Sequence, residues 1–462
     1  MAALVPDPLA ADGIAGFAAR IRRGETTIAA TLTAYLERIA ALDGRLGAFE
    51  HVAAEPALAV AQALDKLLAA GTDLGPLMGV PVAVKDIVAT EGMPTTVGSN
   101  VDVADLIGPE GAFMRSLRRA GCVILGKVKT VEFAAGGTGI NYVRGTPWNP
   151  WDAETQREPS GSSSGSGVAM AAGLCGFAVG SDTTGSIRGP AAHCGVFGHK
   201  TTKGMWPTDG VYPLVPTLDT LGSLTRSAAD AAQIFAGLTR APVPVPVAAR
   251  GLRLGRPSPL FFENLDAQVE RAIAEAFARL TAAGVEIVPV DVPEAVEIVD
   301  DFVDFLPMEM IACLGRARFL AHRAEMDPLV AARGDAGLDV SADTYIPLLR
   351  RHRELCGIAA RRMHGFDGWV TPTRPTVPAP VVSRAEAEAR PPTPPNQWPN
   401  TPAVSYFGLC ASSSPVHGLT GGLPVGLQLM CPGGADARLL AIARTFEEIL
   451  GPPPKPELAP FL

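Results

Sequence analysis

Short apolar runs alternate with amphipathic stretches along the first third of the chain. The predicted elements are a helix over 26–43 capped by Thr26 or Thr27, a strand over 80–84, a helix over 113–120 closed by Gly121, and a strand over 123–125. An alternation of strands with helices favours the α/β class.

The second half continues in the same way, with more helix. The pattern predicts a stiff extended segment over 241–246, a helix capped by Asp266 and stopped before Gly284, a strand over 285–290, mostly helix over 294–364, and a proline-rich surface loop over 391–395. A length of 462 residues suggests two or three domains. A single large α/β sheet can also hold a chain of this size.

Composition excludes several classes of protein. The chain has 39 Lys and Arg against 47 Asp and Glu, a net charge of −8, so it lacks the basic excess that autonomous nucleic-acid binding needs. No apolar run approaches the roughly 18 to 20 residues of a membrane span, and the N-terminus lacks a basic leader, so we expect a cytoplasmic protein. The seven scattered cysteines contain no CxxC pair, which indicates buried free thiols and no metal site.

The stretch 159–188 is rich in glycine, serine and alanine. A flexible linker is a poor explanation, because apolar helix and strand patterns follow at once. Its loops offer hydroxyls beside exposed backbone N–H groups, which could bind a phosphate or stabilise an oxyanion. The phosphate alternative is weaker, since neither GxxxxGK[ST] nor GxGxxG is present.

Lys85 directly follows the apolar strand over 80–84. Burial there would lower its pKa by penalising the charged form, and at its ordinary pKa only about one lysine in a few thousand is neutral at pH 7. The alternative is a surface lysine neutralised by the adjacent Asp86. No histidine has a Ser-His-Asp context, so a serine activated by lysine remains the candidate nucleophile system.

At these residues the chain closely resembles the amidase signature family. The motifs that carry the resemblance are Gly79-Val-Pro-Val-Ala-Val-Lys-Asp86, Ala120-Gly-Cys-Val-Ile-Leu-Gly-Lys127, Asn149-Pro-Trp-Asp152, Ser160-Gly-Ser-Ser-Ser-Gly-Ser166, Gly180-Ser-Asp-Thr-Thr-Gly-Ser-Ile-Arg188, Gly198-His-Lys-Thr201 and Gly422-Leu-Pro-Val-Gly-Leu-Gln428. The resemblance implies one large domain with a central twisted mixed β-sheet flanked by helices on both faces. We expect residues 1–70 to be a helical segment on the core, 71–240 the catalytic core, and 241–462 the rest of the sheet and the substrate pocket.

The resemblance also implies a catalytic triad. The lysine maps onto Lys85, a serine after a cis peptide bond onto Ser162, and the nucleophile onto Ser186. Neutral Lys85 would accept a proton from Ser162, which takes one from Ser186 as its oxygen attacks the substrate carbonyl. The residues expected to form the oxyanion hole are Thr183, Thr184, Gly185 and Ser186, and those expected to support the site are Ser163, Asp182 as a brace of the loop, and Arg188 in a structural role.

The chain departs from the family pattern at several positions. Thr184, Ser160 and Ser164 stand where glycines are common, and a β-branched residue at 184 disfavours positive φ and could narrow the acyl pocket. His193 and His199 lie near the nucleophile motif, and we expect them to be packing residues.

The leading function is an amidase that cleaves the C–N bond of small amides, and by extension carbamates (urethanes) or esters, without a cofactor. The alternative is the glutaminase component of a tRNA-dependent amidotransferase, whose partner would supply the RNA-binding surface. For the amidase we expect a small-molecule substrate, no membrane partner and a homodimer. An apolar acyl or aryl group is suggested by an aromatic and methionine set: Trp206, Phe302, Phe305, Met308 and Met310.

Overall fold

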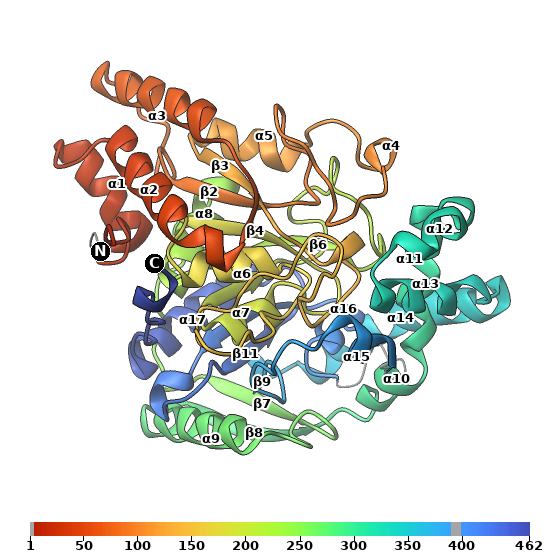
Figure 1. Ribbon diagram of the computed structural model, residues 1–462. Coiled ribbons are helices and arrows are strands. Elements are labelled where there is room, and N and C mark those ends of the chain that lie inside the picture. The colour runs from red at the N-terminus through yellow and green to blue at the C-terminus, as the bar shows by residue number, and fades with distance from the viewer. Residues whose placement is uncertain (1–3, 390–398) are drawn as a thin grey trace.

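A computed structural model describes residues 4–389 and 399–462, which form a sheet of eleven strands with helices packed around it (Figure 1). The order of the strands across the sheet is β1-β3-β2-β4-β6-β5-β10-β11-β9-β7-β8. The strands are β1 (Phe49–Val52), β2 (Pro81–Lys85), β3 (Val123–Val128), β4 (Phe177–Asp182), β5 (Phe197–Lys200), β6 (Thr220–Thr225), β7 (Arg253–Ser258), β8 (Glu286–Asp291), β9 (Gly368–Pro372), β10 (Cys410–Pro415) and β11 (Gly426–Cys431).

The sheet is mixed, as predicted. Strand β2 lies parallel to both β3 and β4, and β7 lies parallel to both β8 and β9. The strands between β4 and β9 pair antiparallel, and so do β1 and β3. Because β2 and β4 are parallel neighbours, the residues that follow their carboxyl ends meet at one edge of the sheet.

The helices flank this sheet. They are α1 (Gly13–Arg23), α2 (Ile28–Leu46), α3 (Ala54–Ala69), α4 (Ala104–Ile107), α5 (Ala112–Arg119), α6 (Ser164–Ala171), α7 (Arg188–Cys194), α8 (Ala228–Thr239), α9 (Ala267–Ala282), α10 (Ala295–Asp300), α11 (Phe305–Leu314), α12 (Arg316–His322), α13 (Pro328–Leu338), α14 (Ala342–Arg362), α15 (Arg384–Ala389), α16 (Pro402–Tyr406) and α17 (Asp436–Leu450). Helices α6 and α7 pack against each other and against β4, β5 and β10. Helices α10–α14 form a group on the side opposite α1–α3 (Figure 1).

Most predicted elements are found within a few residues of their expected bounds. Thr27 is the cap of α2, since its side chain accepts a hydrogen bond from the Ala30 N–H. Asp266 stands at the cap position of α9, but its carboxylate accepts from the Val377 N–H instead of from the helix. The predicted loop over 391–395 lies outside the described residues, and the division at residues 70 and 240 stays a prediction.

All seven cysteines are free thiols, five of them buried. None of the helices in the described ranges combines the length and the apolar character needed to cross a membrane. The same ranges hold no group of three or more His, Cys, Asp or Glu side chains arranged for a metal ion.

Candidate active site

Lys85 is the last residue of β2 and is fully buried. Its Nζ lies 2.7 Å from Ser162 Oγ and 2.8 Å from Ser181 Oγ. Burial lowers the pKa of Lys85 to about 7, although the negative charges of Asp219 and Asp182 act to raise it. Lys85 is therefore poised to exchange a proton near neutral pH.

Asp86 does not neutralise Lys85. Its Oδ1 forms a buried ion pair with Lys127 at 2.8 Å, and its Oδ2 accepts from the backbone and hydroxyl of Thr96. The alternative of a surface lysine paired with its neighbour is thus wrong, because β2 lies between two strands and withdraws Lys85 from water.

Ser162 follows a cis peptide bond from Gly161, as expected. The Ser162 carbonyl accepts hydrogen bonds from the Val131 N–H and the Thr130 hydroxyl, which fix the loop before α6. A Cβ on Gly161 would lie 2.6 Å from the Gly136 carbonyl oxygen, so only glycine fits there. The neighbouring Ser160 has a φ of 60°, the left-handed conformation that glycine prefers.

Ser186 stands between β4 and α7. The Ser163 N–H donates to the Ser186 carbonyl at 3.3 Å, so the loop of Ser162 and the loop of Ser186 are joined through the backbone. Ser186 is 8% exposed and lines a cavity. Three residues far apart in sequence, Lys85, Ser162 and Ser186, are therefore brought to one site. Thr184 beside them is half-buried and does not adopt a positive φ.

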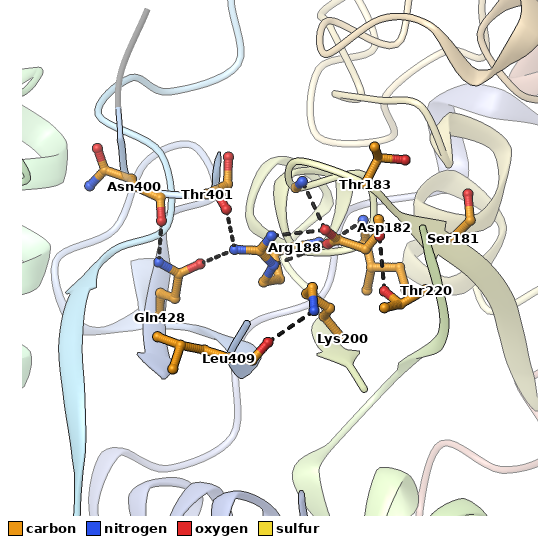
Figure 2. A network of polar contacts seen from close by, with 12 residues as sticks. Ser181, Asp182, Thr183, Arg188, Lys200, Thr220, Asn400, Thr401, Leu409 and Gln428 are labelled. Carbon is orange, nitrogen blue, oxygen red and sulfur yellow. Dashed lines mark hydrogen bonds and ion pairs between the residues drawn. The ribbon is translucent and has the colours of Figure 1, made fainter. Parts of the chain in front are cut away.

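Asp182 braces the turn that carries Ser186, as the sequence predicted. Its carboxylate accepts from the N–H groups of Gly185 and Ile187 and forms a fully buried ion pair with Arg188 at 2.8 Å (Figure 2). Burial acts to raise the pKa of Asp182, but the Arg188 charge and the hydrogen bonds outweigh it and hold the pKa below its ordinary value. An ionised brace suits a structural role.

Arg188 continues this network toward the C-terminal half of the chain. Its Nη1 donates to the Thr401 carbonyl and to Gln428 Oε1, at 2.9 and 2.7 Å. The Gln428 amide nitrogen in turn donates to the Asn400 carbonyl at 2.7 Å (Figure 2). The turn with Ser186 is thereby tied to β11 and to the segment before α16.

The cavity at Ser186 measures about 180 Å³, and polar and apolar residues line it in similar numbers. Its walls come from Ala134 and residues 136–138, from Gly161, from the turn 183–186, from Leu214 and Leu306, from Arg333 of α13, and from 373–375 and 400–402. Arg333 and Arg374 bring two guanidinium groups to this cavity. No ion pair of Arg333 is found within the described residues, and it donates to the Ala135 carbonyl.

The aromatic and methionine set proposed for the pocket does not line this cavity. Phe302, Phe305 and Met310 are fully buried, with Phe302 packed 4.8 Å from the ring of Tyr406. Trp206 stacks on Phe113 at 5.0 Å. An apolar run indicates burial, but it does not distinguish a core from a pocket.

Two parts of the site were missed in the sequence. Ser181 lies within a motif already singled out, yet its contact with Lys85 depends on the register of β2 against β4. Arg333 lies on a helix without a motif. His193 and His199 are buried and lie outside the lining of the cavity; His199 pairs with Asp436 at 3.2 Å.

The chain is similar to known proteins along most of its length. Residues 30–440 match the family described as Amidase. The chain is 38% identical over 448 residues to 2-amino-5-chloromuconic acid deaminase of Comamonas testosteroni, covering 95% of this chain and 96% of that protein. It is 34% identical over 493 residues to the A component of the Glutamyl-tRNA(Gln) amidotransferase of Salinispora arenicola, covering 96% and 98%. The peptide amidase structure from Stenotrophomonas maltophilia superposes with a TM-score of 0.80 at 28% identity, over 98% of this chain and all of that one.

Proposed function

This chain belongs to the amidase family and is a hydrolase of C–N bonds, and from that premise we propose that it acts on small carboxylate-bearing amides through an acyl-enzyme on Ser186. The observation that carries the proposal is the buried contact of Lys85 Nζ with Ser162 Oγ at 2.7 Å. A neutral amine at that point can accept the proton of the serine, so the site does not need a histidine as its base.

In the proposed reaction, Ser162 passes its proton to neutral Lys85 and takes the proton of Ser186 as Ser186 Oγ attacks the carbonyl carbon. The relay then returns a proton to the leaving nitrogen, the C–N bond breaks, and ammonia or an amine departs. Water hydrolyses the remaining ester and restores Ser186. The 2.7 Å contact supports the first proton transfer of this relay, and the transfer between the two serines is part of the proposal.

We assign the developing negative charge on the substrate oxygen to backbone N–H groups of the turn 183–186. The Gly185 N–H donates to Asp182 Oδ1 at 2.8 Å. The oxyanion proposal therefore rests on Thr183, Thr184 and Ser186. Each such donor contributes on the order of 3 kcal/mol to stabilising the transition state.

The carboxylate preference rests on the charge of the cavity wall. Arg333 and Arg374 line the cavity beside Ser186, and a guanidinium is the side chain that best matches a carboxylate in two parallel hydrogen bonds. The Comamonas relative is named for an acid from which an amino group is removed, and that name fits an anionic substrate.

The similarity to the amidotransferase component supports a second candidate function. The similarity spans nearly the whole length of both chains, and glutamine, an amide that carries a carboxylate, would suit the same cavity. In that case the chain would be a glutaminase whose ammonia is delivered to a partner protein. We prefer the stand-alone hydrolase, because the deaminase is the more similar of the two relatives.

A substrate panel tests the proposal. The purified chain is assayed alone for release of ammonia or an amine from a dicarboxylic acid monoamide, a neutral amide of equal length, a carbamate, 2-amino-5-chloromuconic acid and glutamine, and for release of the alcohol from an ester. We expect turnover of the anionic amide and formation of its acyl adduct at Ser186, detected by intact mass. If glutamine is the only substrate turned over, and only when a partner protein is present, the result would favour the amidotransferase component instead.

The seven free thiols suit a reducing compartment, so we propose the cytoplasm as the location of the protein. A homodimer stays a prediction.

A further inference from the structure

A second, smaller cavity lies behind the turn that carries Ser186. It measures about 70 Å³, and we call it the rear cavity. It shares three lining residues with the larger cavity at Ser186, namely Ala134, Thr183 and Leu214. The two cavities are therefore neighbours, divided by these side chains.

The rear cavity reaches the lysine side of the site. Ser181, whose hydroxyl oxygen accepts from Lys85 Nζ at 2.8 Å, is part of its lining. Asp219 also lines it, and the Asp219 carboxylate accepts from the Thr183 hydroxyl at 2.6 Å. A small polar molecule in this cavity would thus lie near both the proton relay and the divide toward Ser186.

Tyr212 supplies an independent sign that the rear cavity takes a polar ligand. The residue is 1% exposed, lines the cavity, and its hydroxyl has no hydrogen-bond partner among the described residues. A buried hydroxyl left without a partner costs roughly 1–3 kcal/mol, so such groups are normally satisfied by an ordered water.

The volume of the rear cavity and its access to the protein surface favour water as the ligand. A volume of about 70 Å³ admits one or a few waters but not the acyl part of a substrate. The exposed residues Thr208 and Pro216 form part of the same lining, so the cavity extends from the protein surface inward.

We infer that the rear cavity is a water port, which supplies the nucleophile for the second half of the reaction while the acyl group fills the larger cavity. This inference rests on the proposed acyl-enzyme. A water molecule held at Tyr212 and Asp219 passes Thr183 and attacks the acyl carbonyl carbon. Its oxygen forms the new C–O bond, the bond to Ser186 Oγ breaks, and the proton of the water returns through Ser162 to Ser186 Oγ, which releases a carboxylic acid.

Two variants test the port by different means. Val211→Phe fills the rear cavity from a half-buried lining position, and Tyr212→Phe removes only the unpartnered hydroxyl. Val245→Phe, at a 65% exposed position, is the matched control for the first variant. Pre-steady-state turnover of a chromogenic anilide separates acylation, seen as a burst of released aniline, from deacylation, seen as the steady rate. Thermal melting verifies that each variant is folded.

We expect both port variants to keep the burst rate and to lower the steady rate by about tenfold, because Tyr212→Phe removes a hydrogen bond to the nucleophile and Val211→Phe fills the space that the water occupies. A crystal structure of the wild type is expected to contain a water within hydrogen-bond distance of the Tyr212 hydroxyl. An unchanged steady rate in both folded variants, or an equal loss in the burst and the steady rate, would overturn the port. The proposed function fails separately, if the wild type forms no acyl adduct on Ser186.

Discussion

Lys85 Nζ and Ser162 Oγ are 2.7 Å apart, although 77 positions separate the two residues in the chain. The contact exists because β2 ends beside the loop that leads into α6, in an environment closed to water. That environment brings the pKa of Lys85 to about 7, so a large fraction of the molecules carry a neutral lysine at neutral pH.

The first prediction concerns the pH profile. The proposed relay needs neutral Lys85, so kcat/KM is expected to rise with pH and level off above a pKa near 7. Asp219→Asn removes a negative charge that raises the pKa of Lys85, and the rising limb should therefore move to lower pH. The measurement is kcat/KM between about pH 5 and 10 for both proteins, roughly the range in which the two forms interchange. A limb that stays in place in the folded variant would contradict this electrostatic link.

The second prediction concerns the nucleophile. Ser186→Ala should lower kcat by at least about 10⁴-fold, because a serine acyl-enzyme cannot form. The matched control is Ser164→Ala in the neighbouring loop, since the Ser164 hydroxyl is buried and has no hydrogen-bond partner among the described residues. We expect that control to retain activity within about threefold. Steady-state kinetics of both variants on one anionic amide would decide the assignment, and an active Ser186→Ala protein would remove it.

The third prediction concerns stability. Asp182→Ala leaves the fully buried Arg188 guanidinium without its carboxylate, and the free energy of unfolding should fall by about 3–5 kcal/mol. The control is Glu275→Ala, which breaks an exposed pair with Arg279 and should cost less than about 1 kcal/mol. Urea denaturation of the two variants and the wild type measures the difference. Equal effects from the two substitutions would show that the buried network does not stabilise the fold.

The fourth prediction concerns substrate charge. Arg333→Gln should raise KM for a dicarboxylic acid monoamide at least about tenfold, the effect of losing a charge-assisted hydrogen bond. For a neutral amide of equal length KM should change little. Arg279→Gln, at an exposed position on α9, is the control. If KM rises equally for both substrates, Arg333 shapes the cavity and does not recognise a carboxylate.

Local patterns predicted those parts of the molecule that local chemistry determines. The apolar run before Lys85 indicated β2, and Thr27 was correctly included among the caps of α2. The partner of Asp266 was not predictable, because Val377 lies 111 positions away and meets it only through the fold.

Prediction of the site from the sequence was limited in the same way. Lys85, Ser162 and Ser186 were selected from motifs. The structure places Lys85 against Ser162 and joins the loops of Ser162 and Ser186 through the backbone, and the catalytic roles stay a prediction. Ser181 required the register between two strands, and Arg333 required the packing of α13 against the cavity. Phe302 shows the opposite error, since its apolar neighbourhood marked a core and was interpreted as a pocket.

The hydrogen bonds from Arg188 to Thr401 and Gln428 have a consequence for synthesis of the chain on the ribosome. Lys85, Ser162 and Ser186 are translated early, but Arg188 finds these two acceptors only after residue 428 has been made. A nascent chain can therefore form β2 and β4 while the turn with Ser186 still lacks its anchor. The hydrogen-bond network that anchors this turn is therefore complete only when β11, the last strand of the chain, joins the sheet.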